Sequence, residues 1–158
     1  MLCFVLRHRF EINPAFGVKL AVRVLRVLVG RGQMIAAFNT AGEVVAVGGY
    51  CVGTPENRFE DLRTIWIDMV AIREDLRGTR LFYRGIRFLL AHLAANVADV
   101  DAVEFYTSAA RADAIRLFGK FAGQPEIVMD RYGEEARFRL PLANLQHYVV
   151  RLDGRPLS

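Results

Sequence analysis

The stretch from Thr64 to Phe88 constrains the fold of this chain most, because an apolar run leads into a charged turn and then into an amphipathic segment. Residues 64–72 are rich in β-branched and other apolar side chains and predict a strand. After Arg77-Gly78-Thr79-Arg80, residues from about 79 to 97 carry apolar positions on one helical face. Such a strand–loop–helix junction directs backbone N–H groups and the positive end of a helix at one point. This stretch therefore predicts a site for phosphate or another anion.

The length and composition predict one domain, residues 1–158, that is large enough to bury a core. No apolar run reaches the ~18 residues that a membrane span needs, and the N-terminus shows no basic leader with a cleavage site. We therefore expect a cytoplasmic protein with no membrane partner. Cys3 and Cys51 lack the spacing of a metal site, so we expect buried free thiols and no metal.

The charge of the chain has two interpretations. The net charge is +4, and 19 of the 21 basic residues are arginine. This ratio reflects either a GC-rich genome or a phosphate-rich partner, which is a nucleotide cofactor or a nucleic acid. The arginines are scattered singly, and this pattern gives little support to a nucleic-acid-binding arm.

Apolar patterning predicts the other elements. We expect strands at 2–10, 33–38, 43–52, 102–106, 127–131 and 135–140, and helices at about 14–30 and 111–121. Asn39-Thr40-Ala41-Gly42 predicts a hairpin turn. Together these elements describe a mixed sheet with helices on both faces. Residues 144–158 are expected either to close the domain or to add a strand that pairs between the subunits of a homodimer.

This order of elements, together with two short motifs, resembles the GNAT N-acetyltransferase superfamily over residues 5–142. In that family the fourth strand ends in a V-x-V-x-P-x-x-R-G-like elbow, which is similar to the run from Val70 to Gly78. An Asn-x-x-Ala-x-x-Leu-Tyr-x-x-x-Gly-like run on a later helix is similar to the residues from Ala114 to Gly123. The resemblance implies an α/β (α+β) domain with a mixed, mostly antiparallel sheet flanked by helices on both faces. It also implies transfer of an acyl group, in the first instance acetyl, from acyl-coenzyme A to a primary amine by direct attack.

The sequence departs from the family pattern at four residues. The family's phosphate loop reads Gln/Arg-x-x-Gly-x-Gly/Ala, and Arg80 and Phe82 stand at its two small positions. Arg80 partly compensates through a charge-assisted bond to phosphate, whereas Phe82 either crowds the cofactor or turns into the core. On the later helix, Arg111 replaces the usual Asn and Phe118 the usual Tyr. Since phenylalanine has no ionisable group, the acid that protonates the leaving thiolate is missing or has moved.

Four residues are candidates for proton transfer. Asp68 lies in an apolar strand, where burial raises a carboxyl pKa toward neutrality and suits a base, unless the side chain is solvated or paired with arginine. Glu104 in the next strand is a second carboxylate near Asp68 or an exposed glutamate. Tyr106 and Ser108 are the nearest replacements for the missing Tyr, with core packing and helix capping as the alternatives.

The resemblance also implies a set of residues that bind the co-substrate. The strand backbone would pair with the pantetheine arm, the elbow amides would bind the pyrophosphate, and Thr79 would also cap the helix. The residues concerned are Met69, Val70, Ala71, Ile72, Arg77, Gly78, Thr79, Arg80, Leu81, Arg111 and Phe118.

Two other functions remain open from the sequence. One is a divergent member of the fold with another donor or a nucleic-acid target, and the other is a non-catalytic binding module. For an enzyme, the acceptor is a small-molecule or protein amine that the sequence does not identify.

Overall fold

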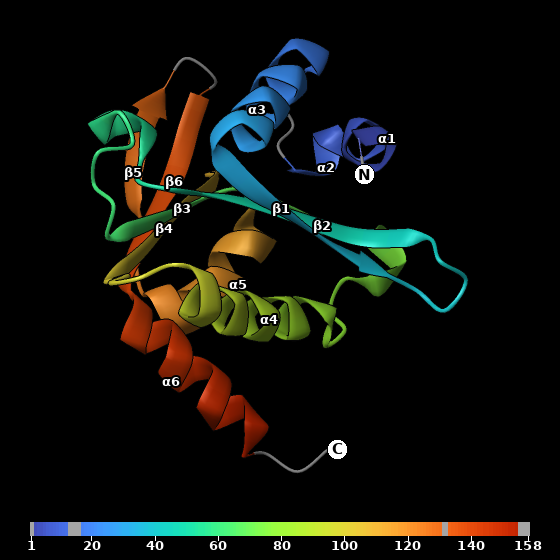
Figure 1. Cartoon of the computed structure of the whole chain (residues 1–158). Helices are drawn as coiled ribbons and strands as arrows, with labels where there is room; N and C mark the ends of the chain where they lie inside the picture. Colours follow the sequence, from blue (N-terminus) through green and yellow to red (C-terminus); the bar gives the residue numbers. More distant parts are fainter. Residues whose placement is uncertain (1, 13–16, 131–132, 155–158) are drawn as a thin grey trace.

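The computed structural model describes residues 2–12, 17–130 and 133–154. Its centre is a six-stranded sheet of order β1-β2-β3-β4-β6-β5, in which only β3 and β4 pair in parallel (Figure 1). The mixed, mostly antiparallel sheet expected from the sequence is therefore confirmed. The strands are β1 (Gly32–Phe38), β2 (Val44–Val52), β3 (Thr64–Ile72), β4 (Ala102–Ser108), β5 (Glu126–Asp130) and β6 (Gly133–Pro141).

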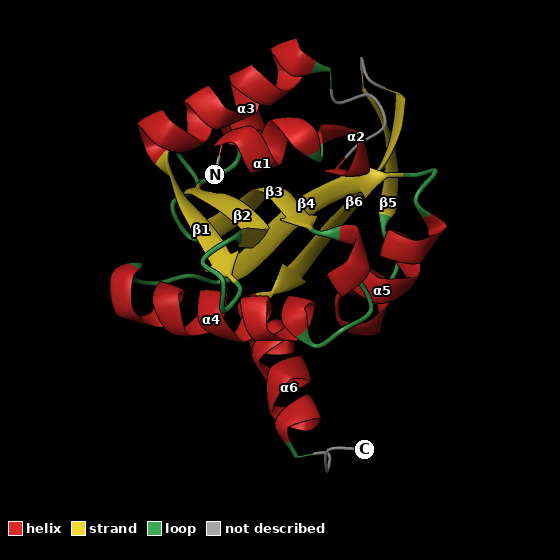
Figure 2. Ribbon diagram, turned by 90° about the vertical axis from the view of Figure 1, so that its right-hand side faces the viewer, coloured by secondary structure: helices red, strands yellow, loops and turns green. Residues whose placement is uncertain are grey.

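Helices cover both faces of the sheet, as expected. In Figure 2, α1 and α3 lie on one side of the strands, while α4 and α5 lie on the other and α6 projects away from the domain. The helices are α1 (Leu2–Arg7), α2 (Arg9–Ile12), α3 (Val18–Arg31), α4 (Leu81–Asn96), α5 (Ala112–Ala122) and α6 (Leu142–Asp153), with short 3₁₀ turns η1 (Pro55–Asn57) and η2 (Glu74–Leu76).

The two faces of the sheet bury separate cores. The first core lies under α1 and α3, where Val5 and Leu28 pack against Trp66 and Met69 of β3. The second core lies under α4, α5 and α6 and includes Phe138 of β6, which is fully buried. Because successive residues of a strand face opposite sides, β3 contributes side chains to both cores.

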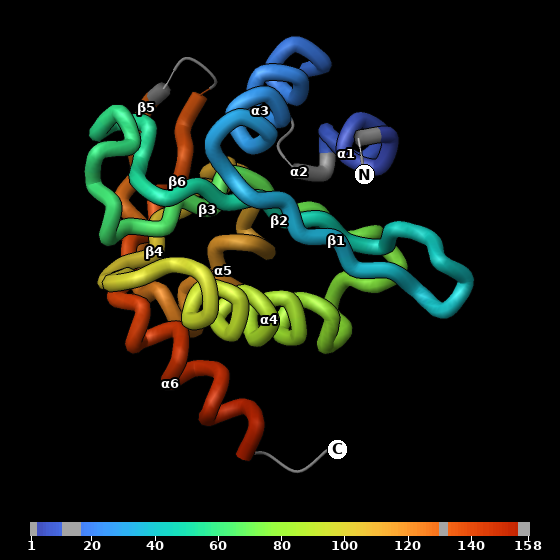
Figure 3. Tube along the Cα trace, viewed as in Figure 1, coloured from blue at the N-terminus to red at the C-terminus, as the bar shows by residue number. Residues whose placement is uncertain are grey.

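The predicted hairpin turn is confirmed between β1 and β2. The side-chain oxygen of Asn39 accepts hydrogen bonds from the N–H groups of Ala41 (3.0 Å) and Glu43 (2.9 Å). Gly42 adopts a left-handed φ of +77°, which glycine reaches without steric cost. The Cα trace shows this turn extending from the domain on the side opposite β5 (Figure 3).

The prediction of a strand at residues 2–10 is wrong. These residues form α1 and α2, and Phe4 and Val5 of α1 are buried in the first core. A short apolar run is compatible with either a strand or a buried helix, and periodicity alone does not separate the two. As a result, the strand–elbow–helix motif starts from β3, the third strand of the sequence, rather than from a fourth.

The alternative of an added C-terminal strand is also wrong. Residues 142–153 form α6, in which Leu145 and Val149 are buried in the second core. Tyr148-Val149-Val150 is typical of a strand, but the spacing of four between Leu145 and Val149 places both on one helical face. Residues 155–158 lie outside the described part of the chain.

The other predicted boundaries differ from the observed ones by a few residues. The expected start of the first long helix at Asn13-Pro14 lies outside the described residues, and α3 begins at Val18 after the N-cap Gly17. The expected helix at 79–97 is α4, which begins two residues later, at Leu81. Among the described residues, no helix has the length and apolarity needed to cross a membrane.

Candidate functional site

The strands β3 and β4 separate at a defined point. They pair in register from Thr64 with Ala102 to Ile67 with Phe105. Both strands continue beyond this point, β3 to Ile72 and β4 to Ser108, without further pairing to each other in the described chain. A notch therefore opens in the middle of the sheet, where one edge of the β3 backbone is unpaired from Asp68 onward.

Asp68 lies at the apex of this notch and also in a β-bulge. On β2, Gly49 pairs with Met69 and its neighbour Tyr50 pairs with Ile67, so Asp68 has no partner across the strand pair. A bulge of this kind redirects a side chain and ends regular pairing, and such bulges are frequent beside active sites. The sequence pattern alone did not reveal it.

The environment of Asp68 favours the neutral carboxyl. Burial raises the pKa of Asp68 to about 6, and the polar Nε1–H of the neighbouring Trp66 lowers it by a smaller amount. This Nε1 makes no hydrogen bond within the described residues. Burial and then the charge of Asp68 raise the pKa of the nearby Cys51 thiol to about 11, so Cys51 stays protonated. Burial therefore moves the pKa of this carboxyl at the notch from the usual acidic range toward neutrality.

The elbow after β3 presents free backbone donors. Gly78 has a left-handed φ of +75°, and a Cβ built there meets no atom within 4 Å. Thr79 Oγ1 accepts a hydrogen bond from the N–H of Leu81 (3.2 Å) and donates one to the carbonyl of Leu76 (2.6 Å). Thr79 thus caps the first turn of α4, although the N-cap position itself is Arg80. Within the described residues, four N–H groups here have no hydrogen-bond partner: those of Gly78, Arg80, Phe82 and Tyr83.

The arginines of the elbow differ in their partners. Arg73 pairs with Asp75 (2.7 Å) and Glu43 (3.6 Å), which fixes it beside the turn. Arg77 donates from Nε to the carbonyl of Ile72 (3.1 Å) and so closes the elbow onto the end of β3. Arg80 is exposed and makes no ion pair within the described chain. Of the three cations, Arg80 is thus the one available to an anion at the start of α4.

Phe82 turns into the core instead of crowding the elbow. Its ring lies 5.9 Å from that of Phe118 and 6.4 Å from that of Phe121, measured between centroids. Phe118 also contacts Phe105 and Phe138 edge-on, with centroids 4.9 Å and 5.7 Å apart. The two aromatic departures from the family motifs, Phe82 and Phe118, therefore join one aromatic cluster between α4, α5 and the sheet.

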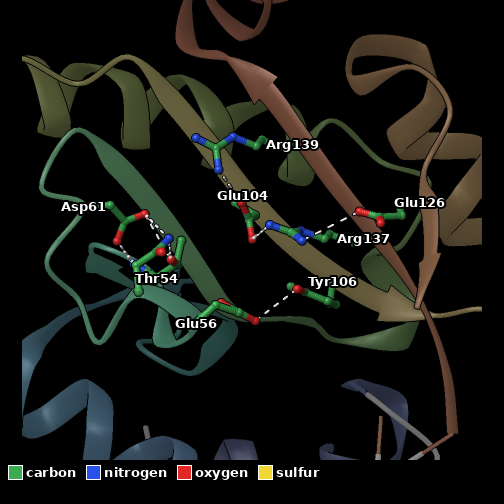
Figure 4. Close-up of polar contacts among 9 residues, drawn as sticks. Thr54, Glu56, Asp61, Glu104, Tyr106, Glu126, Arg137 and Arg139 are labelled. Atoms are coloured by element: carbon green, nitrogen blue, oxygen red, sulfur yellow. Dashed lines mark hydrogen bonds and ion pairs between the residues drawn. The ribbon is translucent and has the colours of Figure 1, made fainter. Parts of the chain in front are cut away.

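Glu104 is buried in an ion-pair network rather than exposed. Its side chain is fully inaccessible to solvent, and its carboxylate contacts Arg137 Nη2 (3.0 Å) and Arg139 Nη1 (3.2 Å) on β6 (Figure 4). Sequence reasoning missed both arginines. The alternation Arg137-Phe138-Arg139 in a strand was the available signal, because alternate residues share one face.

The other candidates lie along the end of β4. Tyr106 donates from its hydroxyl to Glu56 Oε1 (3.1 Å) in η1, and burial followed by the charge of Glu56 raises its pKa. Ser108 Oγ accepts a hydrogen bond from the N–H of Ala110 (3.3 Å) in the turn before α5. Arg111 pairs with Asp113 (2.9 Å) at the start of α5.

The four residues at the end of β3 differ in the burial of their side chains. Met69 and Ala71 are buried in the first core, whereas Val70 is exposed and Ile72 half-buried. Met69 and Ala71 therefore anchor β3 in the first core. Both cysteines are free, with Cys51 buried and Cys3, contrary to expectation, exposed.

Two cavities lie outside the notch. One, of about 230 Å³, lies near Arg31, Tyr50 and His92, and the other, of about 250 Å³, is lined by Gln124, Glu126, Arg137 and Arg139. In the described part of the chain, no group of three or more His, Cys, Asp or Glu residues could hold a metal ion.

No protein-family model and no curated protein matches the sequence. Solved structures do match the fold. The aminoglycoside acetyltransferase AAC(6')-Ib in complex with coenzyme A and kanamycin has a TM-score of 0.67 at 16% identity, with 92% of each chain covered. A spermidine N-acetyltransferase SpeG chimera from Vibrio cholerae and hSSAT has a TM-score of 0.65 at 8% identity, also over 92% of each chain.

A third match carries the family name itself. A GNAT family acetyltransferase from Elizabethkingia anophelis with acetyl-CoA bound has a TM-score of 0.58 at 11% identity, covering 84% of this chain and 86% of that one. In each of these three matches the likeness covers at least 84% of both chains. This chain is a divergent member of the GNAT fold.

Proposed function

We propose that this protein is an N-acyltransferase that transfers an acyl group, in the first instance acetyl, from acyl-coenzyme A to an amine. The observation that carries the proposal is the elbow, where four backbone N–H groups without partners in the described chain and the exposed Arg80 lie at the start of α4. The N-terminus of a helix is a favourable position for a pyrophosphate. Three structural neighbours bind coenzyme A or acetyl-CoA, which supports the same co-substrate here.

The residues present fit this co-substrate. The open left-handed Gly78 leaves space beside the donors, and Phe82 packs away from them. The unpaired backbone edge of β3 from Asp68 to Ile72 offers hydrogen bonds to an amide-containing arm. Acyl-coenzyme A supplies an activated acyl group as a thioester.

Asp68 is the proposed base. With a pKa of about 6 its carboxyl is mostly ionised at neutral pH and can accept a proton from the acceptor amine. The amine nitrogen then bonds to the acyl carbon, the carbon–sulfur bond breaks, and the thiol leaves with a proton. The backbone N–H of Val70, on the open edge of β3, is the proposed donor to the acyl oxygen.

Tyr106 is the proposed proton donor to the leaving thiolate. It lies on β4, across the notch from Asp68, and its hydroxyl carries a proton at neutral pH, although its raised pKa makes it a weak acid. Ser108 and Glu104 are the other candidates on β4; Ser108 Oγ accepts a hydrogen bond in the turn before α5, and Glu104 is held between two arginines.

Calorimetric titration with acetyl-coenzyme A tests the proposal. We expect binding in the micromolar range for the wild type, and a loss of at least tenfold in affinity for Arg80→Glu, because a charge-assisted bond to phosphate becomes a repulsion. Arg116→Glu on the exposed face of α5 is the matched control, with unchanged affinity expected. Absence of binding at millimolar acetyl-coenzyme A contradicts the proposal and favours another donor or a binding module.

A further inference from the structure

Two arginines on β6 line the cavity of about 250 Å³ together with Gln124 and Glu126. Arg137 and Arg139 alternate with the buried Phe138, so both project from the other side of the sheet. Tyr106, the register partner of Arg137, packs against the first core, which identifies this side as the α1 and α3 face.

A buried carboxylate holds both guanidinium groups in place. Glu104 contacts each of them through one oxygen, and removing a buried carboxylate from water is costly unless such contacts are made (Figure 4). A guanidinium has five N–H donors, and Glu104 occupies only part of them. Arg139 has a side chain that is 52% exposed and no second acidic partner among the described residues. Its remaining donors are therefore available in the cavity.

The position of this cavity relates it to the proposed base. Across the sheet, Trp66 of β3 pairs with Glu104 of β4, and Glu104 pairs with Arg139 of β6. Asp68 lies two residues after Trp66 on the same strand. The arginines are on β6, which is two strands away from β3 in the sheet. Neighbouring paired strands are about 4.8 Å apart. Because β3 and β4 separate beyond Ile67 and the cavity extends toward β5, it lies at least about 10 Å from Asp68.

We infer that this cavity binds an anionic group of the acceptor, which makes the acceptor an amine with a carboxylate or phosphate group at least about 10 Å from its nitrogen. The inference rests on the proposed N-acyl transfer. Forked guanidinium donors, fixed in advance by Glu104, bind either anion through paired hydrogen bonds. An α-amino acid does not fit, because one carbon atom separates its two groups. A tripeptide does, since three extended residues span about 10 Å.

Glu126 limits the affinity of this site. Its carboxylate lies 3.7 Å from Arg137 Nη1 and is 67% exposed, so the pairing is weak and the charge repels an incoming anion. Two substitutions at this cavity therefore act in opposite directions. Arg139→Gln removes a donor, whereas Glu126→Gln removes a competitor.

The test compares triglycine with triglycine amide as acceptors, which differ in the terminal carboxylate alone. We expect the wild type to show a KM about tenfold lower for triglycine, the range of one charge-assisted hydrogen bond. Arg139→Gln should abolish this preference, and Glu126→Gln should increase it. Arg116→Gln on α5 is the control that should retain it. A second pair, 6-aminohexyl phosphate and 6-amino-1-hexanol, shows whether phosphate is preferred to carboxylate.

The outcomes separate this inference from the proposed function. Equal KM values for both members of both pairs, or a preference that persists in a folded Arg139→Gln variant, overturn the inference while leaving acyl transfer intact. If Arg139→Gln does not fold, the Glu126→Gln variant decides: a larger preference for triglycine than in the wild type supports the inference, and an unchanged or smaller preference overturns it. If no amine is acylated, the proposed function fails, and titration with triglycine and 6-aminohexyl phosphate followed by NMR decides instead. Binding of either that Glu126→Gln strengthens supports the anion site, and no binding of either overturns it.

Discussion

The ring of Phe82 at the start of α4 packs against the ring of Phe118 in α5, with 5.9 Å between their centroids. These are the two aromatic residues at which the sequence departs from the GNAT motifs. Because each fills the space beside the other, the two departures form one packing unit that joins α4 to α5. The elbow is thereby left clear, and a co-substrate site is compatible with both substitutions.

A double-mutant cycle tests this packing unit. Phe118→Ala should reduce the free energy of unfolding by about 3 kcal/mol. Phe82→Ala should reduce it by less, because Phe118 contacts the rings of Phe105 and Phe138 in addition to those of Phe82 and Phe121. We expect the double variant to lose about 0.5–1.5 kcal/mol less than the two single losses added, which is the range measured for aromatic pairs. Urea unfolding followed by circular dichroism gives all three free energies. If the loss in the double variant equals the sum of the two single losses, the idea that Phe82 and Phe118 form one packing unit is falsified.

Two glycines near the elbow give a matched comparison. Gly78 and Gly85 both have open space around the Cβ position, but only Gly78 has a positive φ. Gly78→Ala should therefore destabilise the protein by about 1 kcal/mol through backbone strain and weaken acetyl-coenzyme A binding. Gly85→Ala lies inside α4 and should stabilise the protein by about 0.5–1 kcal/mol. Thermal unfolding distinguishes them, and similar shifts for both variants contradict the assigned role of the Gly78 conformation.

The rate of acyl transfer should depend on the ionisation of Asp68. Because the ionised carboxylate accepts the proton, kcat/KM should rise as pH increases through about 6 and then level off. Asp68→Asn should lower kcat by about 10²- to 10⁴-fold and remove this limb of the profile. Initial rates between pH 5 and 8 measure both effects. A limb that persists in Asp68→Asn assigns the titration to another group.

The same carboxyl should make stability depend on pH. Folding raises the pKa of Asp68 from 3.8 to about 6, so the folded state favours the neutral form and its ionisation costs stability. Relative to Asp68→Asn, the wild type should lose free energy of unfolding between about pH 4 and pH 6, by at most about 3 kcal/mol. Urea unfolding of both proteins at pH 4, 5, 6 and 7 measures this difference. A constant difference across the series is the contrary result.

The buried network around Glu104 should contribute far more to stability than a surface ion pair. Glu104→Gln leaves Arg137 and Arg139 side by side without a buried counter-charge and should cost about 3–5 kcal/mol. Asp101→Asn removes the pair between Asp101 and Arg63, which is close (2.6 Å) but exposed, and should cost less than about 1 kcal/mol. Denaturant midpoints compare the two variants, and equal losses refute the structural role of Glu104.

The local sequence pattern was sufficient to predict those elements whose apolar periodicity and turn residues agree. The bounds of β3, 64–72, were predicted to the residue because a charged residue, Arg63 or Arg73, lies directly before and after its apolar run. The hairpin turn at Asn39 and Gly42 followed from the residues that such turns require. The chain order of strands and helices then led to the GNAT fold. At both ends of the chain the same reasoning failed, since residues 2–10 and 144–153 combine strand-like composition with helical burial.

The sequence by itself determined the elbow, because a glycine with positive φ, a capping threonine and an amphipathic helix are properties of neighbouring residues. It also placed a carboxylate in an apolar strand at position 68. Only the tertiary structure decided that Asp68 lies in a bulge at a notch, that Phe82 meets Phe118, and that Glu104 lies between two arginines. Each of these depends on strand register or on contacts between elements distant in sequence, and such contacts are set by packing of the whole domain rather than by local preference.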